Sequence, residues 1–232
     1  YLYDSRQQYD TDRLSWQLRA NEGHQITELD DDTLRNLEPD VDTHGKFGLI
    51  AHGWRSFTDP QRLTRELSEY FSELGGEIIN ADIKRIEMGS AKAKCLHLLD
   101  GSQLDVDKLV IAAGCWATTW LSDLGIRIPL APLHGYHTDI ADSGVSLSRP
   151  VVYASGGFVN TPLESGLRIA GTVEIAPLDA LPNYRRAEVL VEKAQRHLFP
   201  GLTHTHGSQW MGARPFMPDS LPVIGPAPGV AD

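Results

Sequence analysis

Gln209-Trp-Met-Gly-Ala-Arg-Pro-Phe-Met-Pro-Asp-Ser-Leu-Pro-Val-Ile-Gly-Pro-Ala-Pro228 is the stretch that carries most information about this chain. Its one cation, Arg214, stands between Ala213 and Pro215 in an apolar segment, where a solvated surface charge is a poor explanation. A guanidinium is planar and always charged, so it suits a carboxylate held by two parallel hydrogen bonds. An internal salt bridge to one of the 31 acidic residues explains Arg214 equally well. The residues alone leave both roles open.

The composition is that of a folded protein of ordinary polarity. The 232 residues suffice for one large domain or two small ones, and 41% of them are hydrophobic. The formal net charge of -10 argues against nucleic acid or an anionic membrane as a partner. The longest apolar run, residues 109–117, is too short to cross a bilayer, and no secretory signal is visible. We therefore expect a cytoplasmic protein that opens at Tyr1 as a piece of a longer gene product or a trimmed form.

Cysteine and histidine usage gives no metal site. Cys95 and Cys115 form no C-x-x-C pattern, so buried free thiols are expected. Two close histidine pairs occur, His134 with His137 and His204 with His206. Neither pair has further ligands nearby in the sequence, which favours surface or strand histidines over metal binding.

The middle of the chain predicts a helix followed by strands. Asp59 and Pro60 open a helix over residues 59–75 that Gly75-Gly76 closes, after a shorter helix within residues 27–39. Before residue 60, only short helices and connections are expected. Strands are predicted at 77–86 and 94–99, with a turn at Asp100-Gly101. The unbroken apolar run 108–114 is typical of a strand buried on both faces, and a helix over 116–124 should follow it.

Residues 126–218 predict a second set of strands with one helix. The strands are expected at 132–140, 150–154, 158–161, 166–173 and 208–217, and the helix at 183–198. A polar turn at residues 164–166 joins two of them as a hairpin. Strands with helices on one side indicate an α+β domain. Because residues 77–114 end in a parallel-type strand and 132–174 in hairpins, the two sets should form separate sheets.

The stretch around Arg214 resembles the closing substrate-site segment of the FAD-dependent D-amino-acid oxidases and dehydrogenases, the family of glycine oxidase and sarcosine oxidase. The segments 110–116 and 124–137 are similar to that family's middle part in order and spacing. The resemblance implies a mixed-sheet substrate domain, with α+β and α/β elements, made of residues 1–58 and 126–218. It also implies that residues 59–125 and 219–232 are the remnant of an FAD-binding domain.

The resemblance implies a set of cofactor and substrate residues. In the family, the turn matching Ala112, Ala113, Gly114 and Trp116 lies against the FAD pyrophosphate, the residue matching Ile83 lies near the adenine, and Ile224-Gly225 belong to the return loop. The arginine matching Arg214 holds the substrate carboxylate, which favours that role here. Relatives carry a Tyr in the hairpin where this chain has Phe158 and Val159. Phe158 is therefore expected to contact the substrate, and the second carboxylate donor is open among Tyr136, His134 and Tyr153. Arg168 is expected to be a solvated charge.

No G-x-G-x-x-G turn occurs in these residues, although the family normally opens with one. The chain is therefore expected to lack the main dinucleotide-binding unit and not to hold FAD at full occupancy. The activity implied is oxidation of a D-amino acid, or a related small amino acid as in sarcosine-type oxidases, to an imine and then a 2-oxo acid. A non-catalytic fragment or binding module is the alternative. The expected partner is a small amino acid, and homo-oligomerisation stays open.

Overall fold

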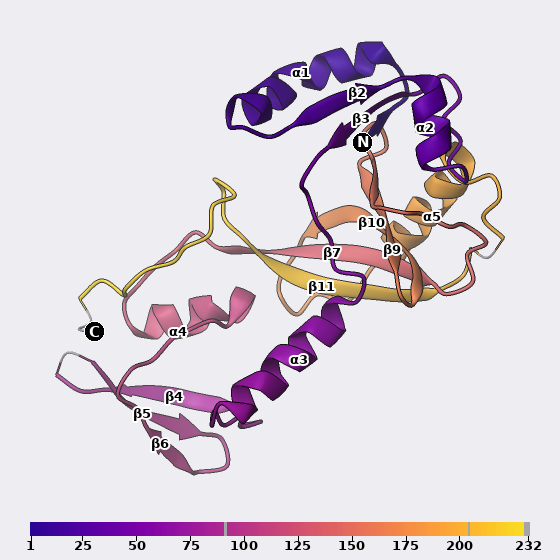
Figure 1. Cartoon of the computed structure of the whole chain (residues 1–232). Coiled ribbons are helices and arrows are strands. Elements are labelled where there is room, and N and C mark those ends of the chain that lie inside the picture. Colours follow the sequence, from indigo (N-terminus) through magenta and orange to yellow (C-terminus); the bar gives the residue numbers. More distant parts are fainter. Residues whose placement is uncertain (91, 204, 230–232) are drawn as a thin grey trace. The chain divides into compact units, whose positions relative to one another are not determined.

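The computed structural model describes residues 1–90, 92–203 and 205–229, which form two compact units (Figure 1). Unit 1 consists of Tyr1–Arg65, Gly135–Glu174 and Leu181–Gly212. Unit 2 consists of Glu66–His134, Ile175–Ala180 and the residues from Ala213 on. The division into two compact units does not test the predicted assignment to a substrate domain and an FAD-binding remnant, which stays a prediction.

The larger sheet has eight strands in the order β11-β7-β10-β9-β8-β1-β3-β2. They are β1 Leu2–Tyr3, β2 Ile26–Leu29, β3 Phe47–Ala51, β7 Ala131–Ile140, β8 Val151–Tyr153, β9 Phe158–Leu163, β10 Gly166–Ile175 and β11 Ser208–Phe216. β9 and β10 pair antiparallel, whereas β1 and β8 pair parallel. A mixed sheet with helices confirms the α+β class, and the strands predicted after residue 131 are confirmed.

Helix α5, Arg185–His197, covers one face of this sheet, as the predicted helix over 183–198 requires. Ala187, Leu190, Val191 and Ala194 are its buried side chains, spaced as on one helical face. They join one core cluster with sheet residues that include Phe158, Leu167 and Ile169. The remaining helices of unit 1 are α1, Arg6–Asn21, and α2, Asp31–Leu37.

The prediction of only short helices before residue 60 is wrong for α1, which has 16 residues. Only Tyr9 and Trp16 are buried in it, so the apolar period that would have revealed the helix is weak. These two rings hold the helix, because they pack with Tyr3 and Leu49 in one cluster. The Trp16 indole N–H also donates to the Tyr3 hydroxyl at 2.7 Å. α2 is confirmed, since the Asp30 carboxylate caps it by accepting from the Thr33 backbone N–H at 2.7 Å.

Helix α3, Pro60–Glu73, confirms the predicted helix. The Asp59 carboxylate accepts from the Arg62 backbone N–H at 2.8 Å, and Gly75 ends the helix with a φ of 89°. Its apolar stripe packs against little, because no residue of α3 is buried and Leu67 is 59% exposed.

Unit 2 contains the smaller sheet, in the order β4-β5-β6. β4 is Ile83–Met88, β5 is Ala93–Leu98 and β6 is Gln103–Asp105, and both pairs are antiparallel. The Gly101 turn joins β5 to β6 as predicted, with a φ of 91°. A short 3-10 turn, Gly114–Trp116, leads into α4, Ala117–Asp123, close to the predicted helix. The strands of 77–114 that form lie in a different sheet from those of 132–174, as expected.

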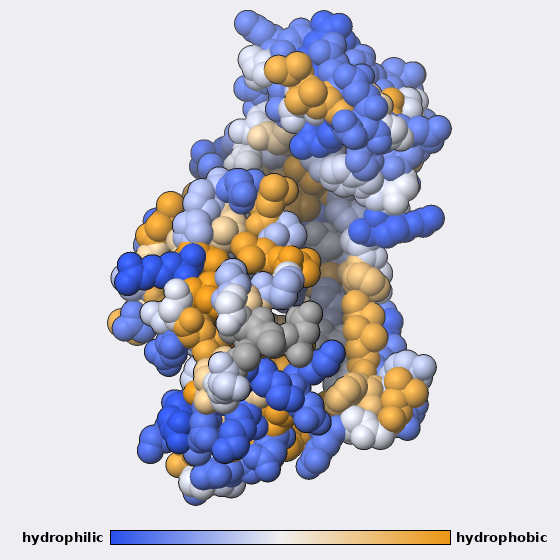
Figure 2. All heavy atoms as spheres, turned by 90° about the vertical axis from the view of Figure 1, so that its left-hand side faces the viewer, coloured by the Kyte–Doolittle hydropathy of each residue, from blue (hydrophilic) through white to orange (hydrophobic). Residues whose placement is uncertain are grey.

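Two predicted strand segments are wrong. Residues 77–82 form no strand, and neither does the run 108–114. A strand buried on both faces needs neighbours on both edges, and the described part of the smaller sheet stops at β6. Val110 is consequently 85% exposed. Figure 2 shows hydrophobic residues, in orange, exposed among hydrophilic ones, in blue, on the face that it presents.

A glycine at the start of β10 should be needed for stability. Gly166 has a φ of 126°, and a Cβ added there would overlap the backbone of Ile140 and Ala141. We expect Gly166→Ala to lower the free energy of unfolding by roughly 3 kcal/mol, through overpacking and backbone strain together. Urea unfolding measures it.

Gly157→Ala is the matched control, because its φ is 71° but a Cβ would meet nothing within 4 Å. It should cost only the strain of a left-handed residue, about 1 kcal/mol. Equal losses in the two variants would contradict the packing argument.

Candidate functional site

Strand alternation divides the residues of the larger sheet between a closed and an open face. On β7, Tyr136, Thr138 and Ile140 are buried and alternate along one face, the closed face, and Ile140 belongs to the core cluster that includes the buried residues of α5. His137 and Asp139, between them, are only partly buried. The pairing of β9 with β10 sets Thr161 beside Arg168 and Val159 beside Ala170. All four of these residues are partly buried, so they define the open face with His137 and Asp139.

The closed face holds Tyr136 and His134, two of the predicted substrate residues. Tyr136 is 1% exposed, and its hydroxyl donates to Glu174 Oε2 at 2.7 Å and accepts from the Asn183 N–H at 3.2 Å. Burial raises the pKa of Tyr136, so the phenol stays protonated. His134 is fully buried, and neither ring nitrogen has a hydrogen-bond partner among the described residues.

Phe158 and Tyr153 also belong to the closed face. Both are core residues, 3% and 2% exposed, and their rings meet edge to face with centroids 5.3 Å apart. The Tyr153 hydroxyl donates to Asp4, and burial is the first cause that raises its pKa. The structure therefore does not bring these side chains onto the face that carries the exposed polar groups.

The open face holds an ion pair that the sequence did not indicate. Arg168 donates through Nε to Asp139 Oδ1 at 2.7 Å and through Nη2 to Asp139 Oδ2 at 2.8 Å. The hydrogen bonds that Arg168 donates to Asp139 raise the pKa of Arg168. The expectation that Arg168 is a solvated charge is therefore wrong. A half-buried guanidinium needs its charge balanced, and the neighbouring strand supplies the carboxylate.

An aromatic pair lies beside this ion pair. The His137 ring stacks on the Trp210 indole, with centroids 5.0 Å apart and an interplanar angle of 20°. His137 Nε2 is 3.6 Å from Asp139 Oδ2. Trp210 nevertheless remains 54% exposed. A Cβ at Gly212 would overlap the far edge of this indole, so the ring leans over Gly212 along the strand.

Arg214 follows Trp210 and Gly212 on the same side of β11, by strand alternation. Its side chain is exposed, and it forms no hydrogen bond or ion pair with any residue that the structure describes. The internal salt bridge that the sequence left open is not seen there. Sequence reasoning found Arg214 but not Trp210, His137 or Asp139, although counting back by twos from Arg214 would have reached Trp210.

The predicted cofactor residues lie in unit 2. Ala112 and Ala113 precede the 3-10 turn that opens at Gly114, which has a φ of 55° and no atom within 4 Å of an added Cβ. Neither Ala112 nor Ala113 donates its backbone N–H to another described residue. Free N–H groups beside small side chains let a phosphate oxygen approach closely. This turn therefore fits one part of a dinucleotide.

The other predicted cofactor positions are accessible. Trp116 is 58% exposed, Ile83 36% and Ile224 88%, and Gly225 follows in a segment without regular structure. Cys95 and Cys115 are buried free thiols, as expected, and burial raises the pKa of Cys115. His204 lies outside the described residues. Among those described, no group of three potential ligands is placed to bind a metal ion, and no helix is long and apolar enough to cross a membrane.

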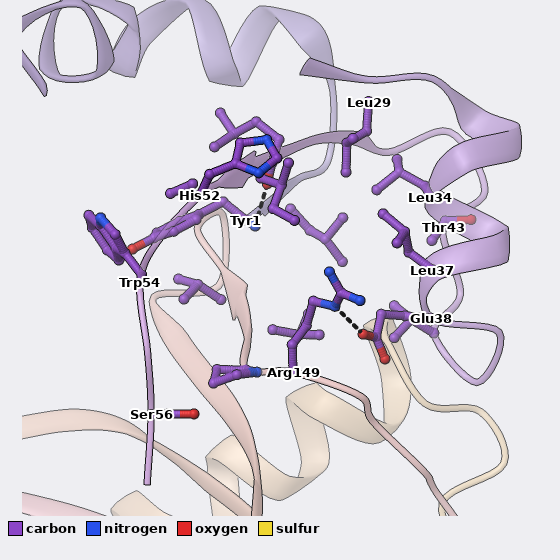
Figure 3. Close-up of a pocket in the computed structure, with 18 of the residues that line it drawn as sticks. Tyr1, Leu29, Leu34, Leu37, Glu38, Thr43, His52, Trp54, Ser56 and Arg149 are labelled. Carbon is purple, nitrogen blue, oxygen red and sulfur yellow. Dashed lines mark hydrogen bonds and ion pairs between the residues drawn. The ribbon is translucent and has the colours of Figure 1, made fainter. Parts of the chain in front are cut away.

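A cavity of about 440 Å³ lies elsewhere in unit 1 and contains none of the predicted site residues (Figure 3). Leu29, Leu34 and Leu37 supply apolar wall, and Arg149 projects between them and Glu38. Glu38 is nearly buried and accepts from the Ser148 N–H and from Arg149 Nε, each at 3.0 Å. These contacts fix the loop before β8 and give Glu38 a structural role.

Comparison with known proteins assigns the chain to a family. A family model described as FAD dependent oxidoreductase matches residues 1–231. The chain is 30% identical to a D-amino-acid oxidase of Bradyrhizobium diazoefficiens over 231 residues, and this match covers 98% of the chain and 54% of that protein. It is 31% identical, over 175 residues, to a D-amino acid dehydrogenase of Paramagnetospirillum magneticum, spanning 73% and 41%. The chain therefore belongs to the FAD-dependent oxidoreductase family, and the resemblance seen in its sequence is confirmed.

Solved structures show the same fold. A glycine oxidase from Bacillus cereus superimposes with a TM-score of 0.81 over 99% of this chain and 63% of its own, at 18% identity. An L-proline dehydrogenase from P. horikoshii superimposes with a TM-score of 0.78, also at 18% identity. The chain spans about half the length of the curated relatives that it matches.

Loss of the Glu38 carboxylate should destabilise unit 1. Glu38→Ala removes the acceptor of three donors and leaves the Ser148 N–H without its partner, so we expect about 2 kcal/mol less unfolding free energy. Glu192→Ala is the control. Its ion pair with Arg185 is 2.7 Å long but solvent-exposed, and should contribute less than about 0.5 kcal/mol. Similar urea midpoints for the two variants would rule out the structural role of Glu38.

The isolated 232 residues should not hold FAD at full occupancy. The open turn at Ala112–Gly114 offers N–H groups to a phosphate, but no G-x-G-x-x-G turn adds those of a helix N-terminus. The measurement is visible absorbance per chain after incubation with FAD and gel filtration. One oxidised flavin per chain would show that these residues suffice.

Proposed function

We propose that this chain forms the amino-acid-binding part of an FAD-dependent enzyme that oxidises a D-amino acid, or a related small amino acid. The observation that carries the proposal is Arg214, an exposed guanidinium in an apolar strand without a described partner. Membership of the family and the names of the curated relatives, a D-amino-acid oxidase and D-amino acid dehydrogenases, support it.

Arg214 binds the substrate carboxylate in this proposal. Two parallel N–H···O bonds fix both the position and the plane of the carboxylate. The orientation of Cα follows from that plane, so one group both binds the substrate and aims its Cα hydrogen. The contribution to rate is mainly one of positioning, because no acid or base of the chain has to act on the reacting carbon.

The reaction is a two-electron oxidation. The substrate loses a hydride from Cα and a proton from its amino group, and the resulting imine reacts with water to give a 2-oxo acid and ammonia. Bound FAD supplies the hydride acceptor. In this chain, the backbone at Ala112, Ala113 and Gly114 would hold part of the pyrophosphate, with Ile83, Trp116, Ile224 and Gly225 as further proposed contacts.

A non-catalytic binding module is the second candidate, favoured by one observation, the lack of a G-x-G-x-x-G turn in these residues. Such a module would bind an amino acid through Arg214 without oxidising it. Arg214 binds the carboxylate in both candidates, which differ in whether the protein reduces a flavin.

Replacement of Arg214 should impair binding and flavin reduction together. In the complete, flavin-loaded enzyme that contains these residues, Arg214→Ala loses a bidentate charged pair, so the ratio kcat/KM for a D-amino acid should fall about a hundredfold or more. Arg214→Lys should recover only part of the loss, because an ammonium keeps the charge but not the fork. Anaerobic stopped-flow reduction measures both the rate and the substrate affinity.

Arg13→Ala is the matched control, since Arg13 is an exposed arginine of α1 and should leave both values unchanged. Wild-type reduction rate and affinity in Arg214→Ala would show that the arginine is structural and that the proposed clamp is wrong.

A further inference from the structure

The cavity of unit 1 lies at the start of strand β1, and we propose that it is a strand-binding slot. Its occupant is an extended peptide segment joined to the Tyr1 nitrogen, which lengthens β1 between β3 and β8. Residues of both flanking strands line the cavity, 50–52 on the β3 side and 150–152 on the β8 side. All of them belong to unit 1. The inference does not depend on the proposed function.

Strand β1 is shorter than the edges of its two neighbours. It has two residues and lies between β8 and β3 in the sheet. Its register pairs Leu2 with Gly48 on antiparallel β3 and with Tyr153 on parallel β8. Beyond the start of β1, β3 runs on to Ala51, and β8 reaches back to Val151. About two further residues would therefore complete the pairing on both sides.

The β3 edge offers free backbone groups to such a segment. Tyr1 and Leu49 exchange two backbone hydrogen bonds, 2.9 Å and 3.0 Å long, so Leu49 faces β1. His52 faces the other way, because its N–H donates to Gln25 O at 2.9 Å. By alternation, Ala51 turns its N–H and C=O toward the slot, where neither has a partner among the described residues. The second position before Tyr1 lies opposite Ala51 and would pair with both groups.

The β8 edge faces the same space. The Ala154 N–H donates to Leu2 O at 2.8 Å, so Val152, two residues earlier, is turned toward the same side. In the parallel register, the Val152 N–H is then directed at the carbonyl of the first position before Tyr1. Backbone donors and acceptors on two facing strand edges are what binds an extended peptide in β-strand addition.

The slot specifies an apolar side chain at its first position. Side chains alternate along β1, since Leu2 joins the core cluster of α5 and Tyr3 joins the cluster of α1. The first position before Tyr1 would therefore face as Leu2 does. On that side lies the apolar wall of the cavity, which is formed by Leu29, Leu34 and Leu37 (Figure 3). A charged side chain against this wall would lose its hydration.

The Tyr1 nitrogen favours a joined segment over a separate peptide. It donates to Leu49 O as a strand amide does, and burial lowers the pKa of this amino group to about 6. A peptide N–H at this place keeps the hydrogen bond and carries no charge to desolvate. A joined segment also loses no translational freedom when it docks. The curated relatives, of which the chain spans about half, are long enough to supply one.

The test extends the protein by Ser-Thr-Val before Tyr1, with Ser-Thr-Asp as the matched control of equal length. Valine should occupy the first position of the slot. Amide hydrogen exchange at Ala51 and Val152 should then slow about tenfold or more, and the urea midpoint should rise by roughly 0.5 M. Aspartate should give neither effect, because its charge would face the leucine wall.

Three results would overturn the proposal. Unchanged exchange at Ala51 and Val152 in the Ser-Thr-Val protein would show that the segment does not enter the slot. Equal effects of the two extensions would show that the leucine wall does not select its side chain. The free peptide acetyl-Ser-Thr-Val-amide should not protect these amides at millimolar concentration, because it has to lose translational freedom. Equal protection by the free peptide would overturn the joined segment as the occupant.

Discussion

Burial of one sheet face beneath α5 is the constraint on which the arrangement of the site depends. Phe158, Leu167 and Ile169 pack into one core cluster with the inward residues of α5. Because side chains alternate along a strand, this burial also fixes which residues point the other way. Arg168 lies between Leu167 and Ile169, so it must point away from α5. The polar groups of the open face are thus placed by the apolar ones behind them.

The same alternation explains why Arg168 and Asp139 pair. Both neighbours of Arg168 lie in the core, so its side chain cannot extend fully into solvent, and only 30% of it is exposed. Leaving that guanidinium without a counter-charge would be costly, whereas a carboxylate on a strand of the same face satisfies it in a bidentate geometry. Once paired, Asp139 also faces His137, and through it the position of Trp210 is fixed. A structural requirement of the sheet therefore supports a ring on its exposed surface.

Local sequence patterns predicted the elements that are determined by interactions between residues close together in the sequence. The sequence predicted helix α5, the hairpin from β9 to β10 and the Asp59 cap of α3, because periodicity, turn residues and capping each act over a few positions. The strand predicted at 108–114 failed for the opposite reason, since an apolar run becomes a buried strand only where neighbours supply its hydrogen bonds. Within the candidate site, Arg214 could be predicted because it is a single cation in an apolar segment. Tyr136, His134 and Phe158 were proposed without asking which face of its strand each one occupies, and all three are buried.

In the proposed function, Arg214 accounts for only one part of substrate recognition. Every amino acid carries the carboxylate that a guanidinium binds, so Arg214 cannot distinguish one side chain from another. Selectivity in that proposal has to come from a surface that meets the variable part of the substrate and is fixed before the substrate arrives.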